Sequence, residues 1–254
     1  MEDEMKDQIR EWLEKGEVDI FIGYKTLDGH PIPHFFSKEN TKDLDDLVTG
    51  PARYSLEKLA LKLVAKNPDL KIGMLGRDCA KRALNVLYLW NQLNPDNVKV
   101  IPLNCCPSGL TDQPNCSLLK PEKAGEIKKE TGIDNTMDMD GAREFGQEER
   151  FSRWTYEFEK CIKCYGCRDA CPVCFCKECS LEHPGLVKTA GLPVEVPIFH
   201  LVRAVHMAGR CVDCGLCEEA CPVDIPRTTL PGHRQITQSL AHTGATCTHN
   251  PLRT

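Results

Sequence analysis

Residues 161–172 read Cys-Ile-Lys-Cys-Tyr-Gly-Cys-Arg-Asp-Ala-Cys-Pro, and residues 211–222 read Cys-Val-Asp-Cys-Gly-Leu-Cys-Glu-Glu-Ala-Cys-Pro. Both stretches have one spacing, in which three cysteines at intervals of three residues are followed by a Cys-Pro pair. Three closely spaced thiolates let one loop wrap three iron corners of a cubane, and this spacing is the ligand frame of proteins that hold two [4Fe-4S] clusters. The sequence therefore predicts two such clusters and single-electron transfer.

The fourth cysteine of each run is predicted to bind the cluster of the other run, as in two-cluster ferredoxins. The predicted ligand sets are Cys161, Cys164, Cys167 and Cys221 for the first cluster, and Cys211, Cys214, Cys217 and Cys171 for the second. This exchange ties two distant segments of the chain together, so loss of either cluster should damage the whole module.

Zinc and disulfides are the alternatives for these cysteines. A single C-x2-C pair also suits zinc, but two complete runs closed by Cys-Pro are hard to explain in that way. The chain opens with MEDEMKDQIR, which lacks the basic start, apolar segment and cleavage site of a secretory signal. We therefore expect a reducing cytoplasm, where sixteen cysteines indicate metal ligation and a setting poor in oxygen.

Composition argues against two classes of partner. The net charge is only −5, and no basic patch interleaved with aromatic residues occurs, so nucleic acid is not an expected partner. The longest apolar stretches, 59–64 and 194–201, are short or interrupted by Lys62 and His200. A direct membrane span is therefore not expected.

The first half of the chain has the pattern of an α/β domain. Strands are predicted at 18–24, 71–75 and 98–103, with a turn at Asp28-Gly29 that returns the chain along 31–36. Helices are predicted at 55–66, with Ser55 as the N-cap and Glu57 in the first turn, and at 80–93. The order strand, helix, strand indicates a βαβ unit with parallel strands and a right-handed crossover.

The second half is predicted to be loops and helices. Helices are expected at 121–130, 147–160 and, within the roughly forty residues between Cys171 and Cys211, at 194–210. That long helical separation resembles the α-helical ferredoxin of fumarate reductase iron-sulfur subunits and heterodisulfide reductase C subunits, and is less suited to the compact βαβ type. The expected fold is an N-terminal α/β domain with a mostly helical two-cluster ferredoxin domain. We expect the α/β domain to span residues 1–120, a connecting segment 121–150, the dicluster domain 151–230 and a C-terminal tail 231–254.

Eight cysteines lie outside the two runs: Cys79, Cys105, Cys106, Cys116, Cys174, Cys176, Cys179 and Cys247. Three of them crowd into Cys-Pro-Val-Cys-Phe-Cys-Lys-Glu-Cys at 171–179. Others follow neighbouring strands, at the carboxyl edge where α/β domains place their sites. The hypothesis is a third [4Fe-4S] cluster with ligands from Cys79, Cys105 or Cys106, and two of Cys174, Cys176 and Cys179. In the alternative, Cys79 packs at a helix start and the others bind nothing.

The segment Met-Leu-Gly-Arg-Asp-Cys at 74–79, its following helix and the strand ending at Cys105 resemble the N-terminal domain of the coenzyme F-420 hydrogenase/dehydrogenase beta-subunit family. The resemblance covers about residues 15–110 and rests on Gly76, Cys79 and Cys105. That family includes formate dehydrogenase beta subunits, and the resemblance implies a place in a redox complex. Members that reduce deazaflavin have a further C-terminal domain, and this sequence ends soon after its second run. With no G-x-G-x-x-G turn or P-loop either, FAD binding is left open and is not favoured.

Charges around the two runs differ. The first run carries Lys160, Lys163 and Arg168, whereas the second carries Asp213, Glu218 and Glu219 beside Arg210. Because positive charge stabilises a reduced cluster, the cluster held mainly by the first run is predicted to have the higher potential. The alternative is that solvent screens these side chains.

The leading interpretation is an iron-sulfur electron-transfer subunit of an anaerobic oxidoreductase, of hydrogenase, formate dehydrogenase or heterodisulfide reductase type. It would relay electrons between a partner's flavin or metal centre and another subunit, and no catalytic residue can be named. One alternative is a flavin-dependent oxidoreductase that reduces deazaflavin or another soluble acceptor. A further alternative is a zinc-bound scaffold.

Overall fold

The computed structural model describes residues 2–50, 53–103, 146–185, 198–212 and 214–225. They belong to two compact units. The first unit takes the described residues up to 103 together with Gly166–Cys176, and the second takes the other described residues. Four of the cysteines in and after the first run thus belong to the unit that contains the sheet: Cys167, Cys171, Cys174 and Cys176.

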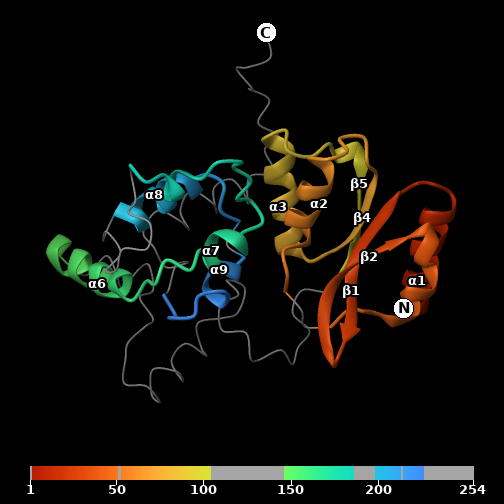
Figure 1. Ribbon diagram of the computed structural model, residues 1–254, viewed down its shortest axis with the longest axis horizontal. Coiled ribbons are helices and arrows are strands. Elements are labelled where there is room, and N and C mark those ends of the chain that lie inside the picture. Colours follow the sequence, from red (N-terminus) through yellow and green to blue (C-terminus); the bar gives the residue numbers. More distant parts are fainter. Residues whose placement is uncertain (1, 51–52, 104–145, 186–197, 213, 226–254) are drawn as a thin grey trace, which may run out of the picture. The chain divides into compact units, whose positions relative to one another are not determined.

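A five-stranded sheet forms the centre of the first unit (Figure 1), with the order β2-β1-β4-β5 and with β3 paired to β1. The strands are β1 (Ile20–Leu27), β2 (His30–Ser37), β3 (Leu47–Val48), β4 (Ile72–Gly76) and β5 (Val98–Pro102). β1 pairs antiparallel with β2 and β3, whereas β1, β4 and β5 are parallel. This confirms the predicted βαβ connection.

The hairpin between β1 and β2 turns at the predicted residues. Asp28 has φ 50° and Gly29 has φ 81°, so both central residues adopt the left-handed conformation that a two-residue type I′ turn requires. The turn sets the register in which Ile22 faces Phe35.

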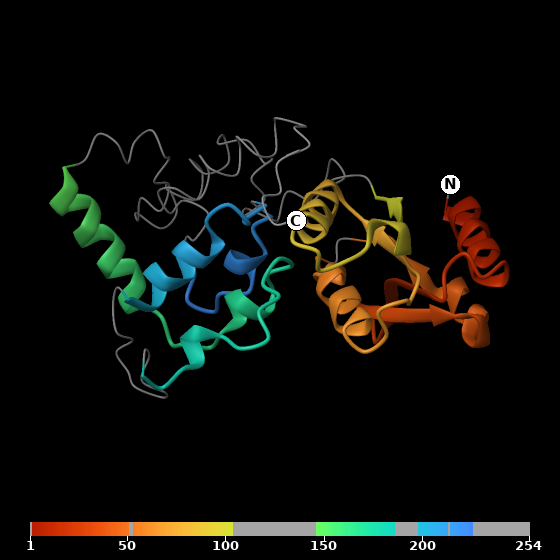
Figure 2. The same ribbon diagram turned by 90° about the horizontal axis from the view of Figure 1, so that it is seen from above.

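Helices cover both faces of the sheet (Figures 1 and 2). α2 (Leu56–Val64) and α3 (Asp78–Leu89) pack on one face, and α1 (Glu2–Glu14) with the 3-10 segment η1 (Lys38–Asp46) packs on the other. A short 3-10 turn, η2 (Pro95–Asn97), leads into β5. The two layers of helix bury both surfaces of β4, all of whose residues are inaccessible to solvent.

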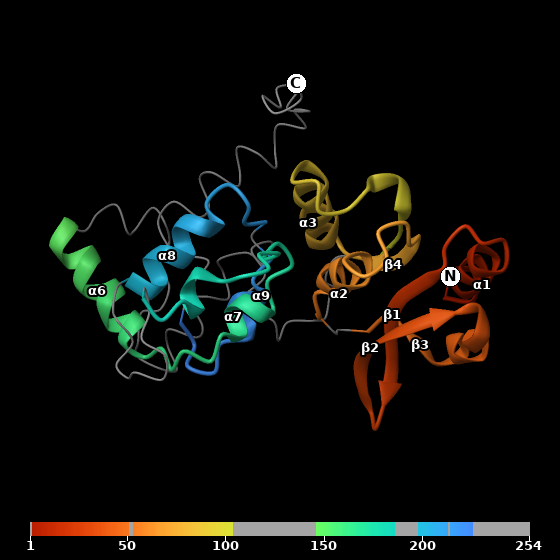
Figure 3. The ribbon, with the colours of Figure 1, turned by 45° about the horizontal axis from the view of Figure 1, so that its top comes forward.

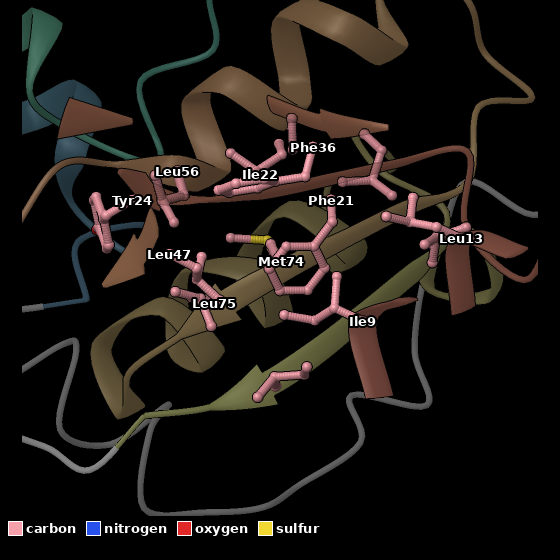
Figure 4. Packing of buried hydrophobic residues seen from close by; sticks show 14 of the residues in the cluster. Ile9, Leu13, Phe21, Ile22, Tyr24, Phe36, Leu47, Leu56, Met74 and Leu75 are labelled. Carbon is pink, nitrogen blue, oxygen red and sulfur yellow. The ribbon is translucent and has the colours of Figure 1, made fainter. Parts of the chain in front are cut away.

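Figure 4 shows the apolar core of this unit, which includes Ile9 from α1, Phe21 from β1 and Met74 from β4. All three side chains are fully buried. The Phe21 ring lies over Gly73, where an added Cβ would stand 2.5 Å from Phe21 Cδ2. A glycine at that position therefore makes room for the aromatic ring beside the central strand.

The second unit contains helices and, among its described residues, no strand. Its elements are α6 (Gln147–Glu159), η4 (Ser180–Glu182), α8 (Ile198–Met207) and α9 (Leu216–Glu219). α6 and α8 lie side by side (Figure 3), with the Phe158 and His200 rings stacked at 4.2 Å between centroids. The helical content agrees with the prediction for this half of the chain.

The boundaries of several elements differ from those predicted. α3 begins two residues early, at Asp78, and ends at Leu89, since Asn91 takes the left-handed conformation at φ 52°. α8 ends at Met207, and Gly209 at φ 74° closes its C-terminal turn. The structure adds α1, η1 and β3, which the sequence analysis did not predict. The predicted helix at 121–130 and the start of the one at 194–210 lie outside the described residues.

Within the described ranges, none of the helices combines the length and the apolar character that crossing a bilayer requires.

Candidate metal centre

The two cysteine runs have the same local backbone. The third cysteine of each run lies in a one-turn helix, Cys167 in α7 (Gly166–Asp169) and Cys217 in α9 (Leu216–Glu219). These helices occupy equivalent positions, 50 residues apart in the sequence. The residue after the second cysteine is left-handed in both, with φ 59° at Tyr165 and φ 76° at Gly215. The sequence repeat is therefore also a structural repeat.

The Cys-Pro pairs that close the runs form matching turns. The Cys174 N–H donates to the Cys171 carbonyl at 3.3 Å, and the Asp224 N–H donates to the Cys221 carbonyl at 3.4 Å. Proline thus occupies the second position of each four-residue turn, where its fixed φ is suited and its missing N–H is not needed. The pair acts as a corner that sets the direction of the chain directly after the fourth cysteine.

Two of the cysteine sulfurs accept backbone hydrogen bonds. The Lys163 N–H donates to Cys161 Sγ and the Ile225 N–H donates to Cys221 Sγ, each at 3.4 Å. Hydrogen bonds to sulfur stabilise the negative charge of a thiolate and of the cluster that it binds. Cys161 and Cys221 belong to the same apolar core, with Trp154, Phe158, Leu181, Phe199 and Ile225. The first cysteine of one run and the last cysteine of the other therefore share one environment.

Burial of the predicted ligands is uneven. The buried ones are Cys161, Cys167, Cys171 and Cys221, the partly exposed ones are Cys211, Cys214 and Cys217, and the exposed one is Cys164. Three of the four ligands predicted for the first cluster are thus shielded from water, against one of the four predicted for the second. Solvent exposure is one of the factors that set the potential of an iron-sulfur cluster.

The donor set suits an iron-sulfur cluster. It offers thiolates, left-handed residues that turn the loop backbone, and N–H donors directed at two of the sulfurs. Within the described ranges, no three side chains of His, Cys, Asp or Glu are arranged to hold a single metal ion. A cubane differs from such an ion because each of its four irons takes its own thiolate, so the ligand sulfurs are spread around it.

The residues proposed for a third cluster fall in different places. Cys79 is the second residue of α3 and is partly exposed, in the same unit as Cys174 and Cys176. Cys179 belongs to the second unit and packs against its apolar core. Cys105 and Cys106 lie outside the described residues, as do Cys116 and Cys247. The ligand set of a third cluster stays a prediction.

The segment Gly166–Cys176 belongs to the sheet unit, and its side-chain and backbone contacts there include those with Trp90 and Lys58. The Phe175 ring lies 5.9 Å from the Trp90 ring at the end of α3. The Lys58 ammonium of α2 donates to the Arg168 carbonyl at 2.8 Å. Burial lowers the pKa of Lys58, and the neighbouring Cys174, Cys171 and Asp169 act in the opposite direction. This cation beside the cysteine segment was not found by sequence analysis, because the two residues are 110 positions apart.

A group of buried polar side chains lies near the end of β4. The Tyr24 hydroxyl donates to the Tyr54 carbonyl at 3.1 Å, and Arg77 donates to the Gly50 carbonyl at 2.8 Å. Burial is the main cause of a raised pKa for both Tyr24 and Glu57. Ser55 is the N-cap residue as predicted, but its hydroxyl makes no capping hydrogen bond and donates to Glu57 Oε2 at 3.2 Å. Nothing in the sequence indicates that Glu57 is buried, since carboxylates are common in the exposed first turns of helices.

Two of the positive charges predicted to raise the potential of the first cluster are paired. Lys160 Nζ lies 2.8 Å from Glu157, and Arg168 Nε lies 2.9 Å from Asp169. The carboxylates offset part of the positive field that the sequence indicated. Asp213 of the second run lies outside the described residues, so the predicted order of the two potentials stays a prediction.

Comparison with known proteins agrees with this chemistry. Residues 157–225 match the family described as 4Fe-4S dicluster domain. The F420-dependent formate dehydrogenase 1 subunit beta of Methanococcus maripaludis is 53% identical over 55 residues, which are 22% of this chain and 14% of that protein. The F420-dependent formate dehydrogenase subunit beta of Methanocaldococcus jannaschii is 49% identical over 74 residues, which are 29% of this chain and 20% of that protein.

These matches cover at most a fifth of the length of either relative. They support the resemblance to formate dehydrogenase beta subunits that the sequence analysis drew. Residues 157–225 are therefore similar to 4Fe-4S dicluster domains, and part of the chain is similar to beta subunits of F420-dependent formate dehydrogenases.

Proposed function

We propose that this chain is an iron-sulfur electron-transfer subunit of a multisubunit oxidoreductase. The observation that carries the proposal is the structural repeat of the two cysteine runs, with matching one-turn helices, left-handed residues and Cys-Pro turns. A repeat of this kind prepares two equivalent sets of thiolates. Each cluster, when bound, accepts and donates one electron, and the protein supplies its ligands and limits its contact with water.

Two [4Fe-4S] clusters are proposed, with the fourth cysteines exchanged between the runs. The ligands would be Cys161, Cys164, Cys167 and Cys221 for the first cluster, and Cys211, Cys214, Cys217 and Cys171 for the second. The shared core around Cys161 and Cys221 supports the exchange, because it brings the last cysteine of the second run into the environment of the first. Both sulfurs also accept a backbone hydrogen bond of the same length.

The domain is proposed to be of the α-helical ferredoxin type. Each run follows a longer helix, α6 before Cys161 and α8 before Cys211. The Cys161 N–H donates to Phe158 and the Cys211 N–H donates to Met207, so each run begins on the last turn of its helix. A compact βαβ ferredoxin would instead need strands in this part of the chain.

The proposed place of the chain is between two redox centres of a formate dehydrogenase complex. The relatives are named as beta subunits of F420-dependent formate dehydrogenases, so a catalytic subunit that oxidises formate is the proposed electron donor. The proposed acceptor is a flavin-containing subunit or domain that reduces coenzyme F420. Electrons would pass one at a time through the clusters, in a direction set by the two partners.

A second function has support in the same names, because F420 is a two-electron acceptor that a flavin reduces. In that case the α/β unit would bind FAD, and the chain would itself be the reducing enzyme. Extraction of a yellow flavin from the purified chain would support this second function. A brown chain that holds its clusters and releases no flavin on extraction would support the electron-transfer role.

The test begins with anaerobic purification, iron and sulfide analysis, and electron paramagnetic resonance of the reduced protein. We expect about eight irons per chain for two clusters, or about twelve if the third cluster is present. Zinc in place of iron, with no reducible signal, would overturn the proposal in favour of a scaffold.

Paired variants test the ligands. Cys221→Ser should disturb the cluster whose other ligands are Cys161, Cys164 and Cys167, whereas Cys116→Ser, outside all the proposed sets, is the control and should leave the spectrum unchanged. Cys79→Ser examines the third cluster. It should remove about four irons if that cluster exists and none if it does not.

A further inference from the structure

A lysine of the α/β unit contacts the segment that carries a proposed ligand. Lys58 stands in the first turn of α2, and its half-buried ammonium donates to the Arg168 carbonyl of α7 at 2.8 Å. The sheet unit includes both groups, since Gly166–Cys176 belongs to it.

The same carbonyl also accepts the backbone N–H of Cys171, at 3.3 Å. Lys58 and Cys171 are therefore bound to one oxygen atom, and the ammonium lies at the base of the turn that presents the Cys171 sulfur. Cys171 itself is buried. A positive charge so placed acts on the sulfur through a partly dry environment, where water screens it less than at the surface.

Other charges around Lys58 indicate what the lysine faces. Cys171, Cys174 and the Asp169 carboxylate interact with the ammonium favourably, and the Arg168 side chain interacts unfavourably. Arg168 is itself paired with Asp169 at 2.9 Å. Placing an ammonium in a half-buried position costs free energy unless negative groups and hydrogen-bond acceptors surround it. The neighbours of Lys58 are such groups and offset part of the effect of burial, which lowers the pKa of Lys58.

We propose that Lys58 is a positioning and tuning residue for the cluster that Cys171 binds: it fixes the Cys171 turn and raises the potential of that cluster. The inference rests on the proposed function. In the exchanged ligand set this cluster is the second, whose own run carries the carboxylates of Glu218 and Glu219. The positive charge of Lys58 beside the Cys171 turn makes the cluster that Cys171 binds easier to reduce.

The experiment is a redox titration of both clusters, followed by electron paramagnetic resonance, in the anaerobically purified full chain. Cys171→Ser identifies which signal belongs to the cluster that Cys171 binds. Lys58→Gln keeps a hydrogen-bond donor but removes the charge, Lys58→Arg keeps the charge, and Lys62→Gln removes an exposed charge from the same helix.

For Lys58→Gln we expect the reduced-to-oxidised ratio of that cluster, at the wild-type midpoint potential, to fall by about three- to tenfold. A tenfold change corresponds to about 59 mV for a one-electron couple. The other cluster should move less. Lys58→Arg and Lys62→Gln should both keep the wild-type potential.

Two outcomes overturn the inference. One is a Lys58→Gln protein with both clusters and unchanged potentials, and the other is an equal shift in Lys62→Gln. If the Lys58→Gln protein loses its clusters, the Lys58→Arg protein is the second test. Iron content and potential like those of the wild type in Lys58→Arg would support the role of the charge, whereas loss of the cluster in Lys58→Arg as well would contradict the inference. A wild-type chain without reducible clusters would instead reject the proposed function, so the two failures are distinguishable.

Discussion

The two units of the molecule are stabilised in different ways. The core of the sheet unit consists of aliphatic and aromatic side chains, among them the fully buried Phe21 and Phe36. Among the described residues, the core of the second unit is smaller, and two of its buried members are the proposed ligands Cys161 and Cys221. Apolar burial alone can stabilise the first core. In the second, part of the core belongs to the proposed metal site, so we expect its folding to depend on the clusters.

Removal of the clusters is the strongest test of this difference. We expect α6 and α8 to lose most of their protection from hydrogen exchange after iron chelation under oxidising conditions, while β1 and β4 keep theirs. The reason is that metal-thiolate binding contributes on the order of 10 kcal/mol to the folding of small metal-dependent domains. Hydrogen-deuterium exchange with mass spectrometry, on protein with and without iron, measures both units in one sample. Equal protection of α6 and α8 in the two samples would show that the second core needs no metal.

A matched pair of aromatic truncations tests the same contrast inside the cores. Phe21 and Phe199 are both buried, with exposed fractions of 0% and 1%. Phe21→Ala should destabilise the sheet unit by about 3–5 kcal/mol, with or without iron, because it leaves a cavity beside β4. Phe199→Ala should have a comparable effect only while the clusters are bound. The free energy of unfolding of each unit is obtained from hydrogen exchange measured at increasing urea concentrations. If the effect of Phe21→Ala depended on iron, the two cores would not differ in the way proposed.

The buried Glu57 gives the sheet unit a dependence on pH. Burial raises its pKa in the folded state above the ordinary 4.5, so above pH 4.5 the folded state binds more protons than the unfolded state does. Stability therefore falls as pH rises from 4.5 through the raised pKa. Glu57→Gln should remove this fall and be more stable than the wild type at neutral pH. Unfolding midpoints measured against pH test this, with the exposed Glu14→Gln as the control, and parallel curves for Glu57→Gln and wild type would reject it.

The smallest expected effect concerns the left-handed residues of the two runs. Gly215→Ala should cost about 1–2 kcal/mol, because a Cβ disfavours a φ of 76°. Tyr165 already accepts that cost at φ 59°, and its hydroxyl donates to the Leu181 carbonyl at 2.9 Å. The Tyr165 ring also packs against Phe199 and the apolar core, and these contacts offset the strain. Thermal unfolding of the iron-loaded Gly215→Ala variant measures this cost, and a neutral result would show that the two loops differ in conformation.

Much of the fold could be predicted because its signals are local. The apolar run at 71–75 indicated a buried strand, and all residues of β4 are buried. The pair Asp28-Gly29 indicated a hairpin turn because these two residue types tolerate the positive φ angles that a type I′ turn requires. α1 was also within reach, since Ile9 and Leu13 are spaced as on one helix face after an acidic first turn, but that pattern was not used.

The site could be predicted only as far as spacing extends. The eight cysteines of the two runs follow from their intervals, whereas the shared core of Cys161 and Cys221 depends on packing between segments far apart in the chain. The same holds for Lys58, whose partner Arg168 lies 110 positions away in α7. No pattern within a window of ten or twenty residues reports such contacts, because each side chain looks ordinary among its own neighbours.

The environment that Cys161 shares with Cys221 also has a consequence for how the protein is made. A ribosome delivers Cys161, Cys164 and Cys167 well before Cys221, so in the proposed ligand set the first site emerges with three of its four thiolates. Cluster insertion must then wait for the last cysteine, and the incomplete loop has to be kept reduced until that residue appears. In living cells both clusters would thus be assembled late in biosynthesis and nearly at the same time. Until then, the unligated thiolates of the nascent chain would be open to oxidation.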